Sequence, residues 1–510
     1  MMTRDVQGLQ RDATRWTVLA GWLGCALIAA CDGDSETSSP TTECGNGVVE
    51  AGEACDGSDL GGATCESLGL EPGGTVGCTA ACVYDTTGCG GELCGNGQID
   101  AGEACDDTEL GGETCQDLGF TDGQLGCDDQ CAFDSSGCYE CGNGTCETTA
   151  GETADSCPAD CDGWLAMSPD WTGTYGLRAD GTLWSWGHSM PWPEQVAVEL
   201  DALAVVASGM SHACAVDVFN LPFCWGDNGY GNLGNGTTED STTAVPPTGL
   251  EGVTTIGVGD GHSCAAKADG TVWCWGMNGA GQLGMGQSLG PDECSGMSCS
   301  TTPEQVSDLT DAVTVAVGGL HACAIDSASA VWCWGCNAGG KLGNGDTASS
   351  TVPVQVMGLS GAATLSAGAG HTCAVTDGHA LWCWGNNPLG QLGDGTTDNQ
   401  NTPVQVSALT NVAQVAAGQT HTCAVTTQGN AWCWGSNGRG QLGDGTGTDS
   451  LAPVPVSSLT NVVSIAAGVE HSCAIVADGT AFCWGANDSG QLGDGNTTDQ
   501  LAPVPVTDVF

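Results

Sequence analysis

The sequence predicts an all-β protein in which a series of similar β-sheet units follows a disulfide-rich, loop-rich module. Three observations indicate this: a repeat of about fifty residues runs over residues 164–510, paired cysteines recur within it, and residues 44–161 carry many cysteines but few large apolar side chains. Repeats of this length are typical of propellers and other arrays. A cysteine-dense segment with few apolar residues depends on cross-links rather than on a core.

The composition excludes several functions before any motif is considered. The chain of 510 residues has 61 Asp and Glu but only 7 Lys and Arg, which gives a formal net charge of −54. Binding to nucleic acid, or to anionic lipid through a basic patch, needs cationic side chains. We therefore expect no nucleic-acid partner. The 33 cysteines favour an oxidising compartment over the cytoplasm.

Residues 1–30 have the features of an export signal. Three arginines precede a short apolar run that ends in Ile28-Ala29-Ala30-Cys31, and this run is shorter than the roughly 20 residues of a membrane span. Its end resembles the cleavage box of bacterial lipoproteins, which implies that Cys31 is lipidated and becomes the new N-terminus. The alternative is ordinary signal cleavage with Cys31 in a disulfide. We expect the protein in the cell envelope or outside the cell, attached to a membrane only through this lipid.

Residues 31–43 are predicted to form an acidic tether, because they lack large apolar side chains. Residues 44–161 then contain three cysteine-rich repeats, at residues 44–89, 94–138 and 141–161. The CGNG opening, the GEACD block and the cysteine order of the first two resemble cysteine-rich repeats of myxobacterial surface proteins. Many disulfide pairings are possible, and the sequence does not choose among them.

The acidic side chains of this module could bind Ca²⁺ weakly. A solvated acidic surface is the favoured alternative, since no complete EF-hand pattern is present. Zinc is less favoured still, because cysteines at this density in an exported protein are usually oxidised. We expect no cofactor and no metal site.

The units of residues 164–510 each carry two cysteines separated by ten residues across a turn. Strands that alternate around a short turn place such residues opposite each other, where the distance between Cα atoms, about 4.5–5.5 Å, permits a disulfide. An earlier copy has Tyr175 and Ser185 at these positions, and it raises the number of units to seven. The predicted disulfides are Cys214–Cys224, Cys264–Cys274, Cys323–Cys333, Cys373–Cys383, Cys423–Cys433 and Cys473–Cys483.

The order of short motifs within each unit is specific. G-x-x-H, then C-W-G or W-x-W-G, then G-Q-L-G-D-G and P-V-x-V resembles the regulator of chromosome condensation repeat. The resemblance implies a seven-bladed β-propeller over residues 164–510. The eukaryotic founder of that family is a nucleotide exchange factor for a small GTPase on chromatin, so exchange activity is implied as a less favoured function here. A secreted bacterial relative inhibits a β-lactamase, which implies a ring that presents loops to a protein partner.

The repeated polar residues are interpreted mainly as structural. One histidine per unit could form a metal-binding or pH-sensing ring, but a propeller spaces these positions around a circle, which favours a repeated hydrogen bond. The Gly393-Asp394-Gly395 loop and its copies could offer carboxylates to Ca²⁺, but turn chemistry is favoured. No catalytic motif is found, so no catalytic residue is predicted.

The third and fourth units depart from the pattern. An insertion adds Cys294 and Cys299, and Cys336 follows where other units have serine or asparagine. One of the three is expected to be a free thiol, unless Cys336 pairs with an insertion cysteine across adjacent blades. This cross-linked loop at the rim is the candidate binding loop, and neutral loop variation is the alternative.

The sequence therefore predicts a lipid-anchored surface protein that is not an enzyme. Its propeller would serve as a binding scaffold for a protein or glycan partner. The alternative function is an enzyme that acts on extracellular polysaccharide through carboxylates in the central depression.

Overall fold

The structure is a computed structural model of the chain. It describes residues 54–56, 58–68, 75–86, 104–106, 108–120, 122–128, 131–139, 163–196 and 203–507, with Val49 and Ile99. The predicted signal, the tether, the third cysteine-rich repeat and Cys31 lie outside the described residues. The chain divides into two compact units, residues 1–93 and 94–510. No helix in the described ranges is long and apolar enough to cross a membrane.

The first unit contains one cysteine-rich repeat with little regular structure. A 3-10 helix, η1 (Glu66–Leu68), precedes a two-stranded sheet of β1 (Gly77–Cys78) and β2 (Tyr84–Asp85). A disulfide joins Cys55 to Cys78, with the two Cα atoms 5.8 Å apart. Because so small a sheet is at best marginally stable alone, the cross-link fixes its position.

The second unit begins with a repeat that is built in the same way. β3 (Asp122–Gly123) pairs with β6 (Cys138–Tyr139), and β4 (Gly126–Cys127) pairs with β5 (Phe133–Asp134). The disulfide Cys105–Cys127 matches Cys55–Cys78 of the first repeat, and a further disulfide joins Cys115 to Cys138. The structure thus supplies these three pairings, which the sequence left open.

The rest of the second unit is a seven-bladed β-propeller, as the sequence predicted, with one antiparallel sheet per blade. In six blades the strands pair in sequence order, whereas in blade 3 the fifth strand in sequence pairs with the third and the fourth lies at the edge. The first strand is the innermost in each blade. Blade 1 has β7 (Trp164–Pro169), β8 (Gly173–Arg178), β9 (Leu183–Gly187) and β10 (Met190–Gln195), and blade 2 has β11 (Leu203–Ser208), β12 (His212–Asp217), β13 (Pro222–Gly226) and β14 (Ser241–Val245). Blade 3 has β15 (Val253–Val258), β16 (His262–Lys267), β17 (Val272–Met277), β18 (Asp292–Cys294) and β19 (Met297–Gln305), and blade 4 has β20 (Ala312–Val317), β21 (His321–Asp326), β22 (Val331–Gly335) and β23 (Ser350–Gln355). Blade 5 has β24 (Ala362–Ala367), β25 (His371–Thr376), β26 (Leu381–Gly385) and β27 (Gln400–Gln405), blade 6 has β28 (Val412–Ala417), β29 (His421–Thr426), β30 (Ala431–Gly435) and β31 (Ser450–Pro455), and blade 7 has β32 (Val462–Ala467), β33 (His471–Val476), β34 (Ala481–Gly485) and β35 (Gln500–Pro505).

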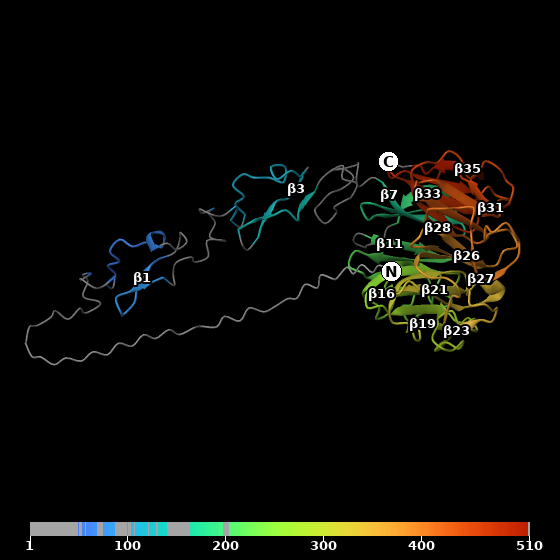
Figure 1. Ribbon diagram of the computed structural model, residues 1–510, viewed down its shortest axis with the longest axis horizontal. Helices are drawn as coiled ribbons and strands as arrows, with labels where there is room; N and C mark the ends of the chain where they lie inside the picture. Colours follow the sequence, from blue (N-terminus) through green and yellow to red (C-terminus); the bar gives the residue numbers. More distant parts are fainter. Residues whose placement is uncertain are drawn as a thin grey trace, which may run out of the picture. The chain divides into compact units, whose positions relative to one another are not determined.

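The ring closes where blade 7 meets blade 1, without an exchange of strands. Figure 1 shows β7 beside β33, although these strands come from opposite ends of the propeller sequence. The amide of Trp164 donates a hydrogen bond to the carbonyl of Gly479 at 2.9 Å. Side chains complete the closure, because the Trp186 indole donates to the carbonyl of Gln491 at 3.0 Å.

The core lies between blades rather than within them. Between blades 3 and 4, for example, Cys264 and Cys274 pack in one apolar cluster with Trp334 of the next blade, and all three are fully buried. The cysteine face of one blade therefore meets the tryptophan face of the next. This arrangement agrees with the alternation of Trp and Cys along the third strand of each blade, which commits both faces of the sheet.

The propeller has two faces with different loops. We call the loop face the one that carries the turn between the first two strands of each blade and the long connection between the last two, such as residues 227–240. The hairpin face carries the turns between the second and third strands, such as residues 218–221. Trp164 bonds to Gly479 in one of these turns, so the chain enters the propeller at the hairpin face.

Candidate functional site

The structure places the six predicted cysteine pairs in direct register on β-strand neighbours and joins each by a disulfide. The two Cα atoms of each pair are 4.0–4.1 Å apart, slightly less than the distance expected from the sequence. All twelve side chains are fully buried. These cysteines are therefore structural cross-links within blades and are not accessible to a ligand.

The candidate binding loop is a cross-linked hairpin on the loop face. β18 and the start of β19 form an extra strand pair of blade 3, and Cys294 is bonded to Cys299 at its tip. Cys336 is half-buried and is the free cysteine of the described part of the chain. The hairpin contacts blade 2, because the Ser295 hydroxyl donates to the carbonyl of Gly229 at 3.1 Å.

The ring of histidines forms a repeated hydrogen-bonded junction between blades. In the junction of blades 5 and 6, His371 Nε2 lies 2.8 Å from Thr422 Oγ1, and that hydroxyl donates to the carbonyl of Gln391 at 2.7 Å. The Trp434 indole donates to the same carbonyl at 2.9 Å. Because the hydroxyl proton is used on the carbonyl, the imidazole must donate from Nε2. Burial lowers the pKa of His371 to about 4, so the imidazole is neutral near pH 7.

The same junction occurs five times around the ring. The pairs of histidine and hydroxyl are His212–Ser263, His321–Thr372, His371–Thr422, His421–Ser472 and His471–Thr174. Burial lowers the pKa of these histidines, for example to about 3 in His212 and His421 and to about 4 in His471. A structural hydrogen bond is therefore the role of these five side chains. Nothing in the described ranges groups three His, Cys, Asp or Glu side chains for a metal.

Two junctions differ from these five. In the junction of blades 3 and 4, Ala322 takes the place of the serine or threonine that bonds to the histidine elsewhere. Both ring nitrogens of the buried His262 therefore lack a hydrogen-bond partner. At blade 1 the histidine position is Gly173 and the following blade has Ala213. The Trp225 indole then donates to the hydroxyl of Tyr175 at 3.2 Å instead of to a loop carbonyl.

The Asp residues of the Gly-Asp-Gly loops act in turns, as the favoured interpretation held. Asp394 Oδ1 accepts hydrogen bonds from the amide and the hydroxyl of Thr396, at 2.9 and 2.8 Å. A buried asparagine inside each long loop organises the rest. Asn387, for example, bonds to Asp394 and Thr396 and accepts from the amide of Leu392. The six long loops are thus rigid platforms with exposed tips on the loop face.

A cavity lies on the propeller axis at the loop face, with about 560 Å³ of open space. Its wall is made by the turns after the innermost strands of all seven blades. Six of these turns carry a glycine, and a side chain there would collide with the neighbouring blade; a Cβ on Gly468, for instance, would lie 2.9 Å from the carbonyl of Asp170. Blade 1 alone has a carboxylate, Asp170, at this place, followed by Trp171, which is 52% exposed.

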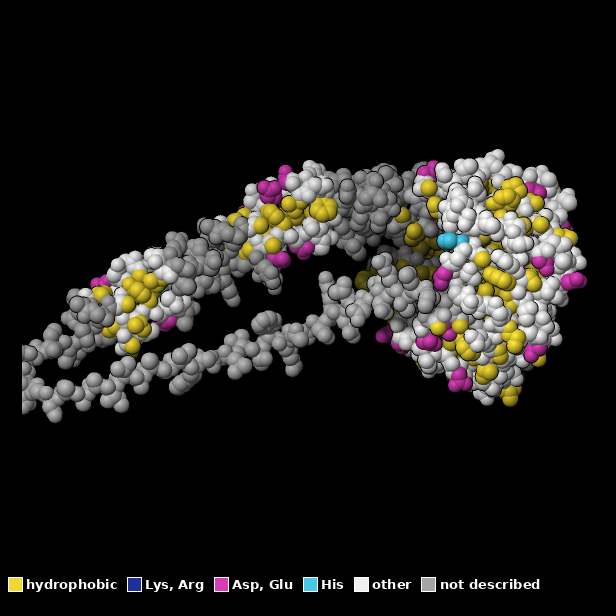
Figure 2. Space-filling view, in the orientation of Figure 1, with side chains coloured by type: hydrophobic (Ala, Val, Ile, Leu, Met, Phe, Trp, Pro, Cys, Tyr) yellow, Lys and Arg dark blue, Asp and Glu magenta, His cyan; other side chains and the backbone are white. Residues whose placement is uncertain are grey.

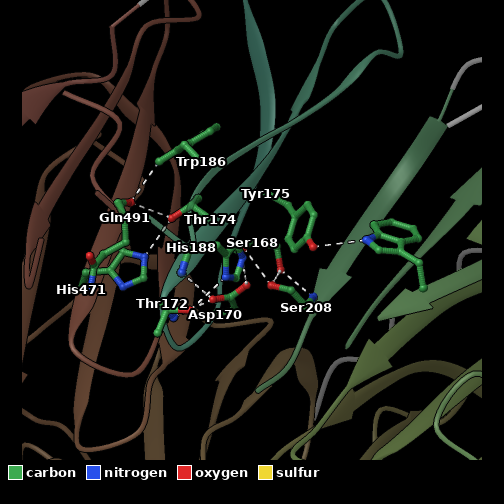
Figure 3. Close-up of polar contacts among 12 residues, drawn as sticks. Ser168, Asp170, Thr172, Thr174, Tyr175, Trp186, His188, Ser208, His471 and Gln491 are labelled. Carbon is green, nitrogen blue, oxygen red and sulfur yellow. Dashed lines mark hydrogen bonds and ion pairs between the residues drawn. The ribbon is translucent and has the colours of Figure 1, made fainter. Parts of the chain in front are cut away.

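The last two strands of blade 1 also lack the long loop of the other blades. A turn of two residues, His188 and Ser189, joins Gly187 to Met190, and both have left-handed backbone angles, with φ of 52° and 81°. Such turns favour Asn and Gly, so this turn is strained, as is common at functional sites. Its effect is to place the imidazole of His188 over the β7–β8 turn (Figure 3).

Three polar side chains meet at this turn, which we call the blade 1 triad: Asp170, Thr172 and His188. His188 Nε2 lies 3.3 Å from Asp170 Oδ2, and His188 Nδ1 lies 3.0 Å from Thr172 Oγ1. Asp170 Oδ1 also accepts from the amides of Thr172 and Gly173, at 2.8 and 2.6 Å. The hydrogen bond to Asp170 raises the pKa of His188.

The sequence did not single out these three residues. Asp170 is buried, Thr172 is half-buried, and the His188 side chain is 43% exposed. A Cβ atom on residue 173 would overlap the imidazole, so Gly173 is needed for its position. The indication in the sequence was a departure from the repeat pattern: blade 1 is the degenerate copy, and His188 lies outside the repeated histidine position.

The cationic side chains of the described propeller are all engaged. Arg178 is buried and stacks on Trp164 and Trp184, with its guanidinium 4.7 and 5.0 Å from the two ring centroids. Arg439 pairs with three carboxylates, the nearest being Asp499 at 2.6 Å. Lys267 pairs with Asp269 at 3.4 Å.

Lys341 is buried beside the axial cavity. Its ammonium donates to the carbonyl of Ala369 at 3.1 Å. Burial lowers its pKa, while Cys336 and Asp260 nearby oppose this effect. No lysine or arginine in residues 163–196 and 203–507 is therefore left to form a basic binding surface.

These features define a class: a seven-bladed β-propeller of repeated blades, six of which are cross-linked. The model of the Regulator of chromosome condensation (RCC1) repeat matches residues 223–266, 269–325, 329–375, 378–425, 428–475 and 478–509. A second model of the same repeat matches residues 253–282, 363–391, 412–441 and 462–491. The chain belongs to the RCC1 repeat family.

Several solved structures share the fold. Human WBSCR16 has a TM-score of 0.56 at 23% identity, over 62% of this chain and 85% of that one. Yeast RCC1 (Prp20) bound to Kap60 has a TM-score of 0.55 at 22% identity, over 64% and 83%. Prp20p from Saccharomyces cerevisiae, described with its binding properties to Gsp1p and histones, has a TM-score of 0.56 at 20% identity, over 68% and 88%. A comparison with curated protein sequences finds no match.

Proposed function

We propose that the protein is an exported, lipid-anchored binding scaffold whose loop face holds a protein or glycan partner. The observation that carries this proposal is the use of the repeated chemical groups. The cysteines are cross-links, five of the ring histidines and their hydroxyl partners join blades, and the loop asparagines hold the loops. The exposed tips of the loops are therefore the part of the propeller that can vary in sequence without loss of the fold.

The proposed address is supported by the cross-links. Disulfides form and persist in oxidising compartments and are rare in the cytoplasm. Six of them join the second and third strands of a blade, and each closes a segment with a separation of ten residues. Attachment through Cys31 rests on the sequence of the signal.

Charge favours a partner with a cationic surface. The chain has a formal net charge of −54, and acidic side chains are scattered over the face of the propeller shown in Figure 2. Complementary charge raises the rate of encounter and selects among partners. The same charge speaks against chromatin binding as a function of this chain, because chromatin binding needs a basic surface. The proposed export speaks against nucleotide exchange, because the small GTPase is inside the cell.

The test is capture of a partner by the mature protein on a solid support, from an extract of the cell envelope. The loop-face variant carries Glu239→Lys and Asp398→Lys, which are exposed in the long loops of blades 2 and 5. The matched control carries Glu251→Lys and Asp377→Lys on the hairpin face, with the same change in charge.

We expect saturable binding that the loop-face variant weakens by about tenfold or more, while the control binds as the wild type does. Equal binding by all three proteins would place the partner elsewhere, and adsorption without saturation would contradict the scaffold function. Turnover of envelope polysaccharides by the wild type, lost on substitution of Asp260 at the axial cavity, would instead support the alternative enzyme.

A further inference from the structure

The blade 1 triad differs from the five hydroxyl–histidine pairs of the blade junctions in the direction of the hydrogen bond between the hydroxyl and the imidazole. In a junction, the hydroxyl donates to a backbone carbonyl, as Thr174 does to Gln491 at 3.0 Å, and the histidine can only donate to it. In the triad, the carboxylate of Asp170 can only accept, so His188 must donate from Nε2. The neutral imidazole then accepts at Nδ1, and its neighbour there is the hydroxyl of Thr172.

The proton of Thr172 therefore points to a base, whereas the proton of each junction hydroxyl points to a carbonyl. This is the arrangement of an activated nucleophile: a hydroxyl, a base within hydrogen-bond distance, and a third group that orients the base. Thr172 and His188 are also partly exposed, while Thr174 and His471 are buried. A substrate can reach the first pair but not the second.

The location of the triad is consistent with chemistry rather than with support of the fold. Blade 1 is the one blade whose axial turn carries Asp in place of glycine, and it lacks the long loop that the other blades have between their last two strands. Its Asp170 and Trp171 line the axial cavity. A strained turn holds the imidazole in place.

We propose that the blade 1 triad accepts acyl groups from carboxylic esters, with Thr172 as the nucleophile, His188 as the general base and Asp170 as a positioning residue. Thr172 Oγ1 attacks the ester carbonyl carbon as its proton passes to His188 Nδ1. The bond from that carbon to the alcohol oxygen breaks, and the alcohol leaves with the proton from Nδ1. Water then attacks the threonyl ester, releases the carboxylic acid and restores the hydroxyl. This activity goes beyond the scaffold function and does not depend on it.

The experiment treats the full mature protein with p-nitrophenyl acetate. Release of p-nitrophenol is followed by absorbance, and the acetylated residue is located by peptide mass spectrometry. We expect acetyl on the hydroxyl of residue 172 in the wild type and in Thr172→Ser. We expect none at that residue in Thr172→Val, which keeps the shape of the side chain. Substitution of the base in His188→Gln should slow acylation by about a hundredfold.

Thr271→Val is the matched control. Its hydroxyl is also half-buried and bonds to a carboxylate, Asp269 at 2.6 Å, but the carboxylate accepts its proton directly and no imidazole lies between them. This variant should react as the wild type does. Equal p-nitrophenol release by the wild type and Thr172→Val, or acetyl found on Lys267 but not on Thr172, would overturn the proposal.

The pH profile separates a catalytic triad from a merely structural one. Acylation needs neutral His188, so its rate should rise with pH through the pKa of His188, which Asp170 raises. Two other titratable groups belong to the surrounding elements. Tyr175 faces the imidazole, with the ring centroids 6.4 Å apart. Asp488, in the long loop of the neighbouring blade 7, is paired with Arg439. Asp170→Asn should move the midpoint of the profile to lower pH. An unchanged midpoint in Asp170→Asn would overturn the role assigned to Asp170.

Discussion

At the scale of single residues, one backbone carbonyl organises the contact between blades in six of the seven junctions. The carbonyl of Gln441, for example, accepts from Ser472 at 3.0 Å and from the Trp484 indole at 2.9 Å. Such buried groups are costly to leave without partners. The junction of blades 3 and 4 lacks one member, because Ala322 has no hydroxyl to offer His262.

Completion of that junction should stabilise the protein. In Ala322→Ser, the new hydroxyl takes the place that Ser263 and Ser472 have in other junctions, between His262 Nε2 and the carbonyl of Gln282. We expect the free energy of unfolding to rise by about 1 kcal/mol, measured by chemical denaturation.

Ala213→Ser is the control for this change. The preceding blade has Gly173 at the histidine position, so the new hydroxyl meets no imidazole and should bring no gain. A loss of stability in Ala322→Ser, or an equal gain in both variants, would show that the junction hydrogen bonds are not the source of the effect.

The sequence predicted the residues that repeat and missed those that do not. The cysteine pairs could be placed because both members lie in one hairpin at a constant spacing. The carbonyl of Gln391, which accepts from the Thr422 hydroxyl, comes from a loop of the preceding blade, so its role depends on how blades pack. No repeated motif pointed to the blade 1 triad, since Asp170, Thr172 and His188 lie in the one unit with no matching copy.

At the scale of elements, each blade is a hairpin with an inner strand and an edge strand added, and in blades 2 to 7 a disulfide closes the hairpin. The edge strands contain the prolines of the P-V-x-V motif, where a missing amide proton costs no ladder bond. The expected insertion in the third unit became a further strand, β18, rather than an irregular loop. Local alternation was enough to predict the hairpins, but the added strand pair depends on the contact with blade 2.

The disulfide of one blade should contribute measurably to stability. In the double variant Cys423→Ala with Cys433→Ala, the unfolded chain regains the freedom of a loop with a separation of ten residues. We expect the free energy of unfolding to fall by about 2–3 kcal/mol, measured by denaturation without reductant. Cys336→Ala is the control, because it removes a thiol but no cross-link, and it should change stability by less than about 0.5 kcal/mol. Equal effects of the two changes would show that the cross-link does not restrict the unfolded chain.

At the scale of the whole molecule, the neutral histidines make the ring sensitive to acid. Burial lowers the pKa of His212, His262 and His421 to about 3 and that of His371 and His471 to about 4, from an ordinary value of 6.5. The unfolded chain therefore binds more protons than the folded chain below that value. The stability from these groups is fully present above pH 6.5 and is lost as the pH falls toward the folded values.

Each such histidine should reduce the free energy of unfolding by up to about 1.4 kcal/mol for every pH unit below its unfolded pKa. Denaturation at neutral pH and at about pH 5 should show a large loss, with several protons taken up on unfolding. In His421→Gln, the number of protons taken up should fall by about one. A free energy of unfolding that does not change over this range would contradict the neutral, buried state of the ring.

The central claim is a closed ring of seven blades, six of them cross-linked, that folds in an oxidising compartment. Alkylation of the native protein without reductant, followed by peptide mass spectrometry, tests it most directly. The account predicts label on Cys336 as the one thiol of residues 163–507 and six disulfide-linked peptides that join Cys214 to Cys224 and the equivalent residues of blades 3 to 7. Label on most of those twelve cysteines would contradict both the cross-linked ring and the oxidising compartment.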